Sequence, residues 1–430
     1  MTTTLPTIAI LGCGNRGGRA YGAWCAENPD RVRVTAIADP DLRYRSAARD
    51  LLGLPESACF DSWEDLLARP RLADGLVIAL TEDMRLEPLQ AAVEKGYQVL
   101  IEKPLARSAE ELAAMDAVVS AHSSQVVACH VLRYQPFFAK VKELVAGGAV
   151  GRVVHIQHNE NMGYWHFTHS YVRGIFRNQE KAGPVILAKT SHDLDIIGWL
   201  ADSPADRVSS LGRLTHFHEG HAPEGAPPRC LDGCPVFDTC AHNAKTFYVD
   251  ELGSSRDWPV SMVEPVATPE ARLAAIQHGP YGRCVYRCDN TQPDQQITTI
   301  TFANGVTATL TASAFTAEDT RTFRIFGTEG EMLGHMHSGH IEVRRFAGAE
   351  TGGVRPFGKG EMAHHVVETT AGHTLGDAGL MAAFVDVLNG TSDDPTTSWS
   401  RSVESQWMAF AAERSRSQDS AWIPLSTLRH

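Results

Sequence analysis

Residues 7–17 read TIAILGCGNRG, a short apolar run that passes directly into three glycines spaced as GxGxxG. The apolar run predicts a buried β-strand over residues 7–11, and residues 16–27 have the composition and period of a helix. A GxGxxG that follows a strand and opens a helix is typical of a turn that binds a dinucleotide. The stretch therefore predicts the first βα unit of a Rossmann domain.

Each residue of this turn has its own predicted part in holding a dinucleotide. Gly12 permits the tight turn, Gly14 lets the backbone approach the pyrophosphate, and Gly17 lets the helix pack closely on the strand. The pyrophosphate would lie at the helix N-terminus, where backbone N–H groups near Asn15 and Arg16 are free to bind it. The other interpretation is a glycine turn without a ligand.

An acidic residue ends the next predicted strand. Asp39 follows the glycines by roughly 20 residues, the spacing at which a carboxylate meets the ribose hydroxyls of a bound dinucleotide. A carboxylate there repels the 2′-phosphate of NADP, so the sequence favours NAD. Arg43 and Arg45 lie close by and leave NADP as the alternative cofactor. Arg43 is included among the predicted cofactor contacts.

The rest of the first 125 residues repeats this alternation of apolar runs and amphipathic segments, which is typical of βαβ units. Strands are predicted over 7–11, 32–38, 75–80, 98–101 and 126–129, and helices over 16–27, 43–52, 63–67, 85–95 and 109–122. The pattern predicts an α/β fold in which residues 1–125 form a Rossmann domain with a parallel sheet.

The pattern changes after Pro136. One helix is predicted over 137–146, and strands of alternating or β-branched character follow, as in 153–159 and 298–312. Residues 126–430 are therefore expected to form an α+β domain with an open, mainly antiparallel sheet, which binds substrate and forms oligomer contacts. Within it, residues from about 216 to 290 are rich in Gly, Pro, Cys and His and read as an insertion.

Composition narrows the class of protein. The formal net charge of -12 disfavours a nucleic-acid partner, because a polyanionic backbone would be repelled. Hydrophobic residues make up 43% and charged residues 21%, as in ordinary globular proteins. No apolar run reaches the roughly 18 residues that a membrane span needs, and no signal peptide is recognisable. We expect a cytoplasmic protein with no membrane contact.

A third motif carries a family resemblance. Glu102-Lys103-Pro104 ends a predicted strand, and the chain continues through residues 132–136 (LRYQP) to residues 192–195 (HDLD). With the glycine turn, these segments resemble the glucose-fructose oxidoreductase, inositol dehydrogenase and MocA family (Gfo/Idh/MocA) over the whole chain. The resemblance implies a Rossmann domain, a nicotinamide cofactor and a sugar-like substrate.

The resemblance also implies residue roles. In that family the lysine of EKP lies near the nicotinamide and the substrate hydroxyl, which assigns this place to Lys103, with Glu102 and Thr81 as cofactor contacts. A partly desolvated ammonium near a positive nicotinamide would have a lowered pKa and could relay a proton. The alternative for Lys103 is a solvated surface charge. The family's second acid/base, a histidine, is matched by His192.

The chain departs from the family pattern just before that histidine. The usual aspartate is replaced by Ala188, which removes a carboxylate that helps to hold the sugar. Lys189 stands three residues before His192, where it either replaces the lost polar contact or faces solvent. Asp193 or Asp195 would orient the imidazole of His192 or form local salt bridges.

Residues 163–173, GYWHFTHSYVR, concentrate aromatic rings with two histidines and an arginine. In a helix, His166, His169 and Arg173 would share one face, and together with Trp165 they would suit a carbohydrate pocket, with the arginine matching an anionic substituent. The alternative is a polar interface between subunits. His373 is a weaker candidate for the same pocket.

Five of the nine cysteines gather in or near the insertion. Cys230, Cys234 and Cys240, with Cys284 or Cys288 as the fourth ligand, would make a structural zinc site; Cys284 is the first choice, and His242 is a further candidate. The alternatives are an iron–sulfur cluster, or free thiols without metal.

Taken together, the motifs predict hydride transfer between NAD and a sugar, glycoside or cyclitol. A second hypothesis is a redox-neutral glycosidase that oxidises, eliminates, hydrates and reduces again, as in family branches that resemble glycosidases for sulfoquinovosides. A third is a regulator that binds NAD(H) only as a ligand. By resemblance alone, the protein is expected to form a homo-oligomer through the outer face of its C-terminal sheet.

Overall fold

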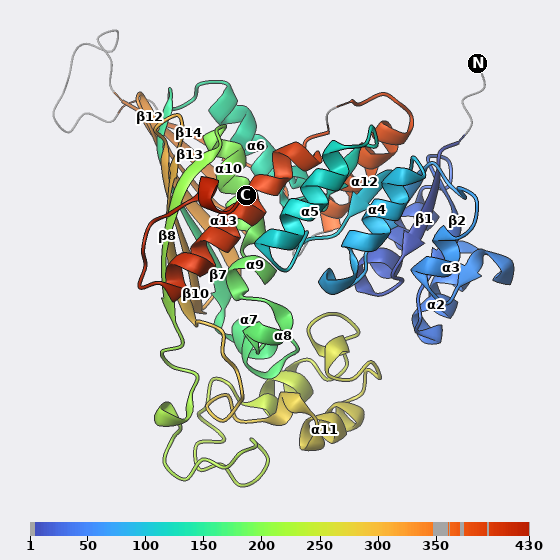
Figure 1. Cartoon of the computed structure of the whole chain (residues 1–430). Helices are drawn as coiled ribbons and strands as arrows, with labels where there is room; N and C mark the ends of the chain where they lie inside the picture. The colour runs from blue at the N-terminus through green and yellow to red at the C-terminus, as the bar shows by residue number, and fades with distance from the viewer. Residues whose placement is uncertain (1–4, 347–359, 361, 370–373, 394, 430) are drawn as a thin grey trace.

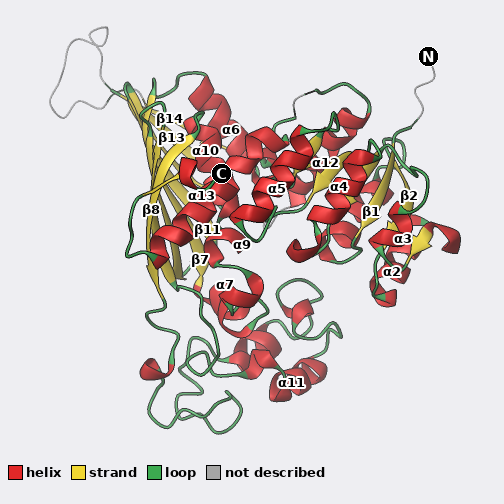
Figure 2. Ribbon diagram, viewed as in Figure 1, coloured by secondary structure: helices red, strands yellow, loops and turns green. Residues whose placement is uncertain are grey.

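The computed structural model describes residues 5–346, 360, 362–369, 374–393 and 395–429. Two sheets organise the chain, and Figure 2 shows them as separate groups of strands with helices between them. Both predicted halves of the fold are confirmed. Figure 1 shows the N-terminal half in blue to cyan and the larger sheet on the opposite side of the molecule.

A six-stranded parallel sheet forms the N-terminal half, in the order β3-β2-β1-β4-β5-β6. Its strands are buried apolar runs, as expected where helices cover both faces. They are β1 (Thr7–Leu11), β2 (Arg33–Ala38), β3 (Cys59–Phe60), β4 (Gly75–Ile78), β5 (Gln98–Ile101) and β6 (Val126–Ala128). The two-residue β3 was not predicted, because it is too short to show a period. The switch point of this order, between β1 and β4, lies beside the glycine turn.

The helices of this half agree closely with the predicted ones. They are η1 (Asn15–Gly22), α1 (Ala23–Glu27), α2 (Leu42–Leu52), η2 (Glu56–Ala58), α3 (Trp63–Leu67), η3 (Glu82–Met84), α4 (Leu86–Glu94) and α5 (Ala109–Ser120). The helix predicted over 16–27 begins as the wider η1 and narrows into α1. Serine or aspartate side chains cap several of them, such as Ser62 on α3 and Ser108 on α5.

A nine-stranded sheet forms the C-terminal half, in the order β14-β13-β12-β11-β7-β10-β9-β8-β15. Only β7 and β10 pair in parallel among its described strands. Its strands are β7 (Val153–Gly163), β8 (Ala205–Arg213), β9 (Gln295–Phe302), β10 (Thr307–Thr316), β11 (Thr320–Gly327), β12 (Gly330–His335), β13 (His340–Arg345), β14 (Met362–Val366) and β15 (Ile423–Pro424). The single segment predicted over 298–312 is two strands, because Gly305 turns the chain with a φ of 85°.

Helices cover one face of this sheet. In Figure 1, α6, α10 and α13 lie against it, and α10 and α13 pack on each other. The helices outside the insertion are η4 (Val131–Tyr134), α6 (Pro136–Ala146), α7 (Tyr164–Phe167), η5 (Thr168–Arg173), α8 (Gln179–Ala182), α9 (Val185–Ala188), α10 (Ser191–Ala201), α12 (Thr374–Leu388), α13 (Trp399–Ser417) and η11 (Leu425–Thr427). Helix α12 returns to the N-terminal half, where it contacts η1 and η4.

The insertion leaves β8 and returns to β9. Figure 1 shows it in yellow-green beyond the ends of β7 and β10. It contains only short helices: η6 (Glu219–His221), η7 (Thr246–Glu251), η8 (Val260–Met262), α11 (Pro269–His278) and η9 (Pro280–Gly282). A small apolar core of its own includes Ala244, Tyr248 and Ile276. Among the described helices, none has the length and apolar character needed to cross a membrane.

Candidate active site at the ends of the parallel strands

The glycine turn has the geometry of a dinucleotide cradle. Gly12 has a φ of 86°, and a Cβ there would lie 2.6 Å from the carbonyl oxygen of Ala79. A Cβ on Gly17 would lie 1.9 Å from the carbonyl oxygen of Gly12, so helix and strand could not approach as they do. Around Gly14 nothing lies within 4 Å of a Cβ position, which leaves its backbone open to a ligand. These features fit a pyrophosphate at the start of η1.

Asp39 follows β2 and reaches the same turn. Its carboxylate accepts hydrogen bonds from the backbone amide of Cys13 at 2.7 Å and from the amide of Asp41 at 2.8 Å. The acid therefore shapes the turn while lying where the ribose of a dinucleotide is expected. Arg43 is exposed and pairs with Asp41. Arg45 pairs with Asp61 and also donates to the backbone carbonyl oxygen of Asp39 at 2.5 Å, so its positive charge lies beside the acid.

Partly exposed Arg16 and buried Glu102 form an ion pair beneath the turn. The Nε of Arg16 donates to Glu102 at 2.7 Å, and its terminal nitrogens bond Asp377 of α12. Tyr21 donates to the same Glu102 oxygen. Burial acts to raise the pKa of Glu102, but Arg16 and Tyr21 hold the charged form and the net pKa is lowered. Arg16 and Glu102, both predicted cofactor contacts, thus link the EKP segment to η1 and α12. Thr81 lies between β4 and η3, directly before η3.

Lys103 connects the two halves of the molecule. It follows β5, and its Nζ donates to the carbonyl oxygen of Ala188 at 2.9 Å. Desolvation lowers the pKa of Lys103 to about 8, and the positive charge of nearby Lys189 contributes. A lysine with this pKa is partly neutral near physiological pH and can accept a proton.

The second predicted acid/base, His192, lies at the start of α10 and is buried. Its ring meets that of His130 edge-on, with the centroids 5.9 Å apart. His130 follows β6, and burial lowers its pKa to about 4. Asp195 is held by Arg133 at 2.6 Å and lies 3.8 Å from His130. Asp195, one of the two carboxylates considered as partners of His192, is therefore engaged in a salt bridge of its own. The other, Asp193, pairs with Arg321.

A buried ionic network continues from this point into the C-terminal sheet. Lys189 pairs with Glu160 of β7 at 3.0 Å, so it does not face solvent freely. Arg321 of β11 bridges Glu160 at 2.7 Å and Asp193 at 2.8 Å. Asp193 also bonds His158 at 2.8 Å. Burial raises the pKa of Glu160 to about 7, although Arg321 and Lys189 oppose the shift.

The four residues predicted as one substrate face fall into two groups. Trp165 and His166 lie on α7, where their rings stack at 5.6 Å and His166 bonds Asp319 at 2.9 Å. This group adjoins the network, because Lys189 lowers the pKa of both His166 and Asp319. The contact of His166 with Trp258 shows that the insertion also borders it.

His169 and Arg173 point into the insertion instead. His169 stacks on Tyr281 at 4.8 Å and bonds the hydroxyl of Tyr248, and burial lowers its pKa to about 3. Arg173 donates to the carbonyl oxygens of Arg283 and His242 and to the sulfur of Cys230. Both side chains lie on η5, and the ring of Trp258 contacts both His169 and His166, so it joins the two groups. His373 lies outside the described residues.

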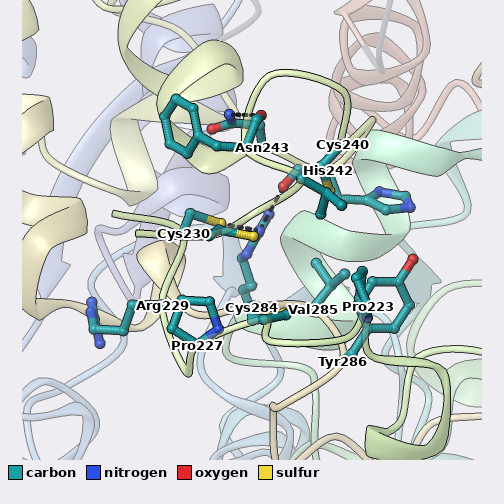
Figure 3. Close-up of a pocket in the computed structure, with 15 residues that line it drawn as sticks. Pro223, Pro227, Arg229, Cys230, Cys240, His242, Asn243, Cys284, Val285 and Tyr286 are labelled. Atoms are coloured by element: carbon teal, nitrogen blue, oxygen red, sulfur yellow. Dashed lines mark hydrogen bonds between the residues drawn. The ribbon is translucent and has the colours of Figure 1, made fainter. Parts of the chain in front are cut away.

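The cysteines gather without forming a site for a single metal ion. Cys230, Cys234, Cys240 and Cys284 all line one pocket (Figure 3), whereas Cys288 bonds the carbonyl oxygen of Cys284 and is not among its lining residues. Across the described ranges, no three His, Cys, Asp or Glu side chains are placed so that they could hold a metal ion. The structure therefore does not support the predicted zinc, because a tetrahedral ion needs its thiolates in contact with one centre.

Sequence reasoning missed Glu160, Arg321 and His130. Glu160 stands in the buried phase of β7, and a carboxylate in such a phase is itself a signal, since buried charges are paired or functional. His130 follows β6 as Lys103 follows β5, and strand ends of a parallel sheet lie at one edge. No local sequence pattern marks Arg321 as a site residue, because its two partners, Glu160 and Asp193, are far away in the sequence.

Comparison with known proteins agrees with both halves of the fold. Residues 7–130 match the NAD-binding Rossmann fold of an oxidoreductase family, and residues 142–425 match the C-terminal alpha/beta domain of the same family. The chain is 28% identical over 209 residues to inositol 2-dehydrogenase of Rubrobacter xylanophilus, covering 48% of this chain and 56% of that protein. It is 35% identical over 126 residues to D-xylose 1-dehydrogenase (NADP(+)) 2 of Haloferax volcanii, covering 29% of this chain and 38% of that protein. The chain thus spans about half the length of the curated relatives that it matches, or less.

Solved structures resemble the whole chain. An oxidoreductase from Agrobacterium radiobacter in complex with NAD+, L-tartaric acid and magnesium superposes with a TM-score of 0.68 at 16% identity, over 99% of this chain and 100% of the other. Levoglucosan dehydrogenase in complex with NADH and levoglucosan gives a TM-score of 0.67 at 17% identity, over 98% and 100%. At these identities the likeness shows the fold. The glycine cradle, the EKP segment at the end of β5 and the two family matches together establish that the chain belongs to the Gfo/Idh/MocA oxidoreductase family.

Proposed function

We propose that the protein is an NAD-dependent oxidoreductase that oxidises a hydroxyl group of a sugar, glycoside or cyclitol. When bound, NAD supplies the hydride acceptor for this chemistry. The chain's own residues must hold the dinucleotide, orient the carbohydrate and take up the hydroxyl proton. The glycine turn, with Gly12, Gly14 and Gly17, and the carboxylate of Asp39 are the groups that would hold the dinucleotide.

The observation that carries the proposal is the position of Lys103. Its Nζ lies 2.9 Å from the carbonyl oxygen of Ala188, so a lysine of the Rossmann half reaches the segment that leads to His192. Burial and neighbouring cations lower its pKa to about 8. A regulator that only binds NAD(H) does not need a lysine tuned in this way, whereas an enzyme that removes a hydroxyl proton does.

The substrate would lie between Lys103 and the C-terminal sheet. We assign Trp165 and His166 to the carbohydrate face and Lys189 to a hydroxyl contact in place of the aspartate that Ala188 lacks. Aromatic faces stack on sugar rings, and a charged group in a pocket gives orientation. His169 and Arg173 are assigned to holding the insertion, because their polar atoms are bonded there.

The names of the relatives agree with this substrate class. Inositol 2-dehydrogenase acts by its name on a cyclitol, and D-xylose 1-dehydrogenase on a pentose. The second of these is named for NADP, whereas Asp39 at the end of β2 favours NAD in this chain. Assembly as a homo-oligomer through the outer face of the nine-stranded sheet is part of the proposal, since Leu211 and Ile297 lie opposite each other there and are exposed.

A redox-neutral glycosidase is the second candidate, and Glu160 is the observation that favours it. Elimination of an aglycone and addition of water each need an acid/base beyond the one that serves oxidation. Glu160 is buried, pairs with Lys189 and has a pKa raised to about 7, which allows it to hold or release a proton at neutral pH. A substrate with an anionic group, such as a sulfoquinovoside, belongs to this second candidate.

One assay separates the two candidates. Purified protein is incubated with NAD and a panel of free sugars, cyclitols and aryl glycosides, neutral and anionic, while NADH and released phenol are recorded together. NADH without phenol supports the dehydrogenase, and phenol without net NADH supports the glycosidase. The control is Lys181→Met, an exposed lysine on α8, beside Lys103→Met in the site. Equal activity of the Lys103→Met variant and the control would contradict both candidates.

A further inference from the structure

We propose that Cys230, Cys234, Cys240 and Cys284 hold an iron–sulfur cluster in the pocket that they line. The pocket lies between the segment of residues 223–243 and residues 284–286, and Arg173 closes it from η5. Its remaining walls are largely apolar, with Val236, Phe237 and Val285 among the lining residues. Figure 3 shows the labelled cysteines around this hollow.

Backbone hydrogen bonds bring the segments that carry the four thiols together. Cys230 donates its amide to the carbonyl oxygen of Gly282, and Cys284 donates its amide to the carbonyl oxygen of Pro228. These two bonds flank an antiparallel bridge between Arg229 and Arg283, and they set the remote Cys284 beside Cys230. Two further backbone bonds, from Phe237 to Cys234 and from Cys240 to Val236, fold the short segment that carries the other two.

The spacing suits a cluster better than one ion. Three cysteines lie in a single segment and the fourth lies far along the chain, the same order as in plant-type iron–sulfur sequences, although the intervals of three and five residues within the segment differ from the plant-type ones. A zinc ion draws its thiolates to about 2.3 Å from one centre, and the described residues offer no three ligands so placed. In an iron–sulfur cluster each thiolate binds its own iron, so four cysteines that line one pocket can hold a cluster without meeting at a single centre.

Arg173 supplies the independent argument from charge. Its guanidinium is fully buried, and it donates hydrogen bonds to two carbonyl oxygens and, at 3.6 Å, to the sulfur of Cys230. In the described part of the chain, it forms no ion pair with a carboxylate. A buried cation requires a nearby negative charge. A cluster bound by four thiolates carries a net negative charge, and a hydrogen bond to a ligating sulfur is a usual feature of such sites.

The cluster would anchor the insertion to the substrate side of the molecule. Arg173 ends η5, which follows directly on α7, the helix that carries Trp165 and His166. This role rests on the proposed function, whereas the presence of the cluster does not. The iron content of the protein therefore tests the cluster whether or not a carbohydrate substrate is found.

The experiment measures iron, zinc, acid-labile sulfide and visible absorption on full-length protein purified without oxygen and reconstituted with ferrous iron and sulfide. We expect about four iron and about four sulfide ions per chain if the cluster is of the [4Fe–4S] type. Cys230→Ser and Cys234→Ser should each lose at least four fifths of the iron. Cys288→Ser, from the same region but outside the pocket, and Cys59→Ser, from β3, should retain it.

Three results would overturn the proposal: zinc without sulfide in the wild type, no metal at all after reconstitution, or equal iron in the pocket variants and the two controls. If the pocket variants do not fold, the wild-type protein still decides the matter, because its iron-to-sulfide ratio and its absorption distinguish a cluster from a bound ion. Cluster content with no activity on any carbohydrate would retain this proposal and count against the proposed function.

Discussion

The pH dependence of the reaction follows from the surroundings of Lys103. An ordinary lysine has a pKa near 10.5, and desolvation lowers that of Lys103 to about 8. At pH 7 the neutral form of the side chain therefore makes up about a tenth of the protein instead of about 0.03%, a gain of roughly 300-fold from the shift in pKa. If neutral Lys103 accepts the hydroxyl proton, kcat/KM for oxidation rises about tenfold per pH unit below pH 8 and levels off above it.

The assay is the initial rate of NADH formation from pH 6 to 10, with the substrate identified in the panel and at constant ionic strength. Lys103→Met removes the proton acceptor and should lower kcat/KM by about 10² to 10⁴-fold. Lys103→Arg keeps the charge but cannot release a proton in this range, so it should be as inactive as Lys103→Met and lose the pH dependence. Lys181→Met should reproduce the wild-type profile.

Two results would refute this reasoning. A wild-type profile that is flat from pH 6 to 10, or that rises only above pH 10, would show that Lys103 does not titrate at a lowered pKa during catalysis. A Lys103→Arg variant that retains a tenth or more of the activity would show that the side chain serves as a fixed charge. His192 would then be the group to test next as the proton acceptor.

Two further predictions concern the buried network and the cofactor. Arg321→Met leaves Glu160 and Asp193 buried without their shared cation and should destabilise the C-terminal half by about 3 to 5 kcal/mol, whereas Arg324→Met on the same strand breaks an exposed pair and should cost under about 1 kcal/mol. Urea denaturation followed by circular dichroism measures both, and equal midpoints would contradict the assignment of the network to stability. Asp39→Asn keeps a hydrogen-bond acceptor for Cys13 but removes the negative charge, so the ratio of kcat/KM for NADP over NAD should rise at least about tenfold. An unchanged ratio would mean that another residue selects the cofactor.

The local patterns of the sequence were sufficient for the fold and for locating the glycine turn and the EKP segment at the ends of parallel strands. Strand and helix periods, the glycine turn and the position of EKP depend on neighbours within a few residues or on the order of βα units, so they can be seen without coordinates. The short β3 and the turn at Gly305 were missed because two or three residues do not establish a period. Lys103 was identified by its motif, and the structure adds its contact with Ala188.

Charge pairing and side-chain grouping were decided only by the tertiary structure. Lys189 could not be assigned to solvent or to a partner until β7 brought Glu160 to 3.0 Å from it. Arg173 was grouped with His166 on a helical face, but the turns of η5 direct it to Cys230. The sequence by itself determined which elements form and where a dinucleotide can bind, because these depend on short-range backbone preferences. Only the tertiary structure decided which buried charges meet and which cysteines share a pocket, because such contacts join segments that are distant along the chain and depend on how both sheets are packed.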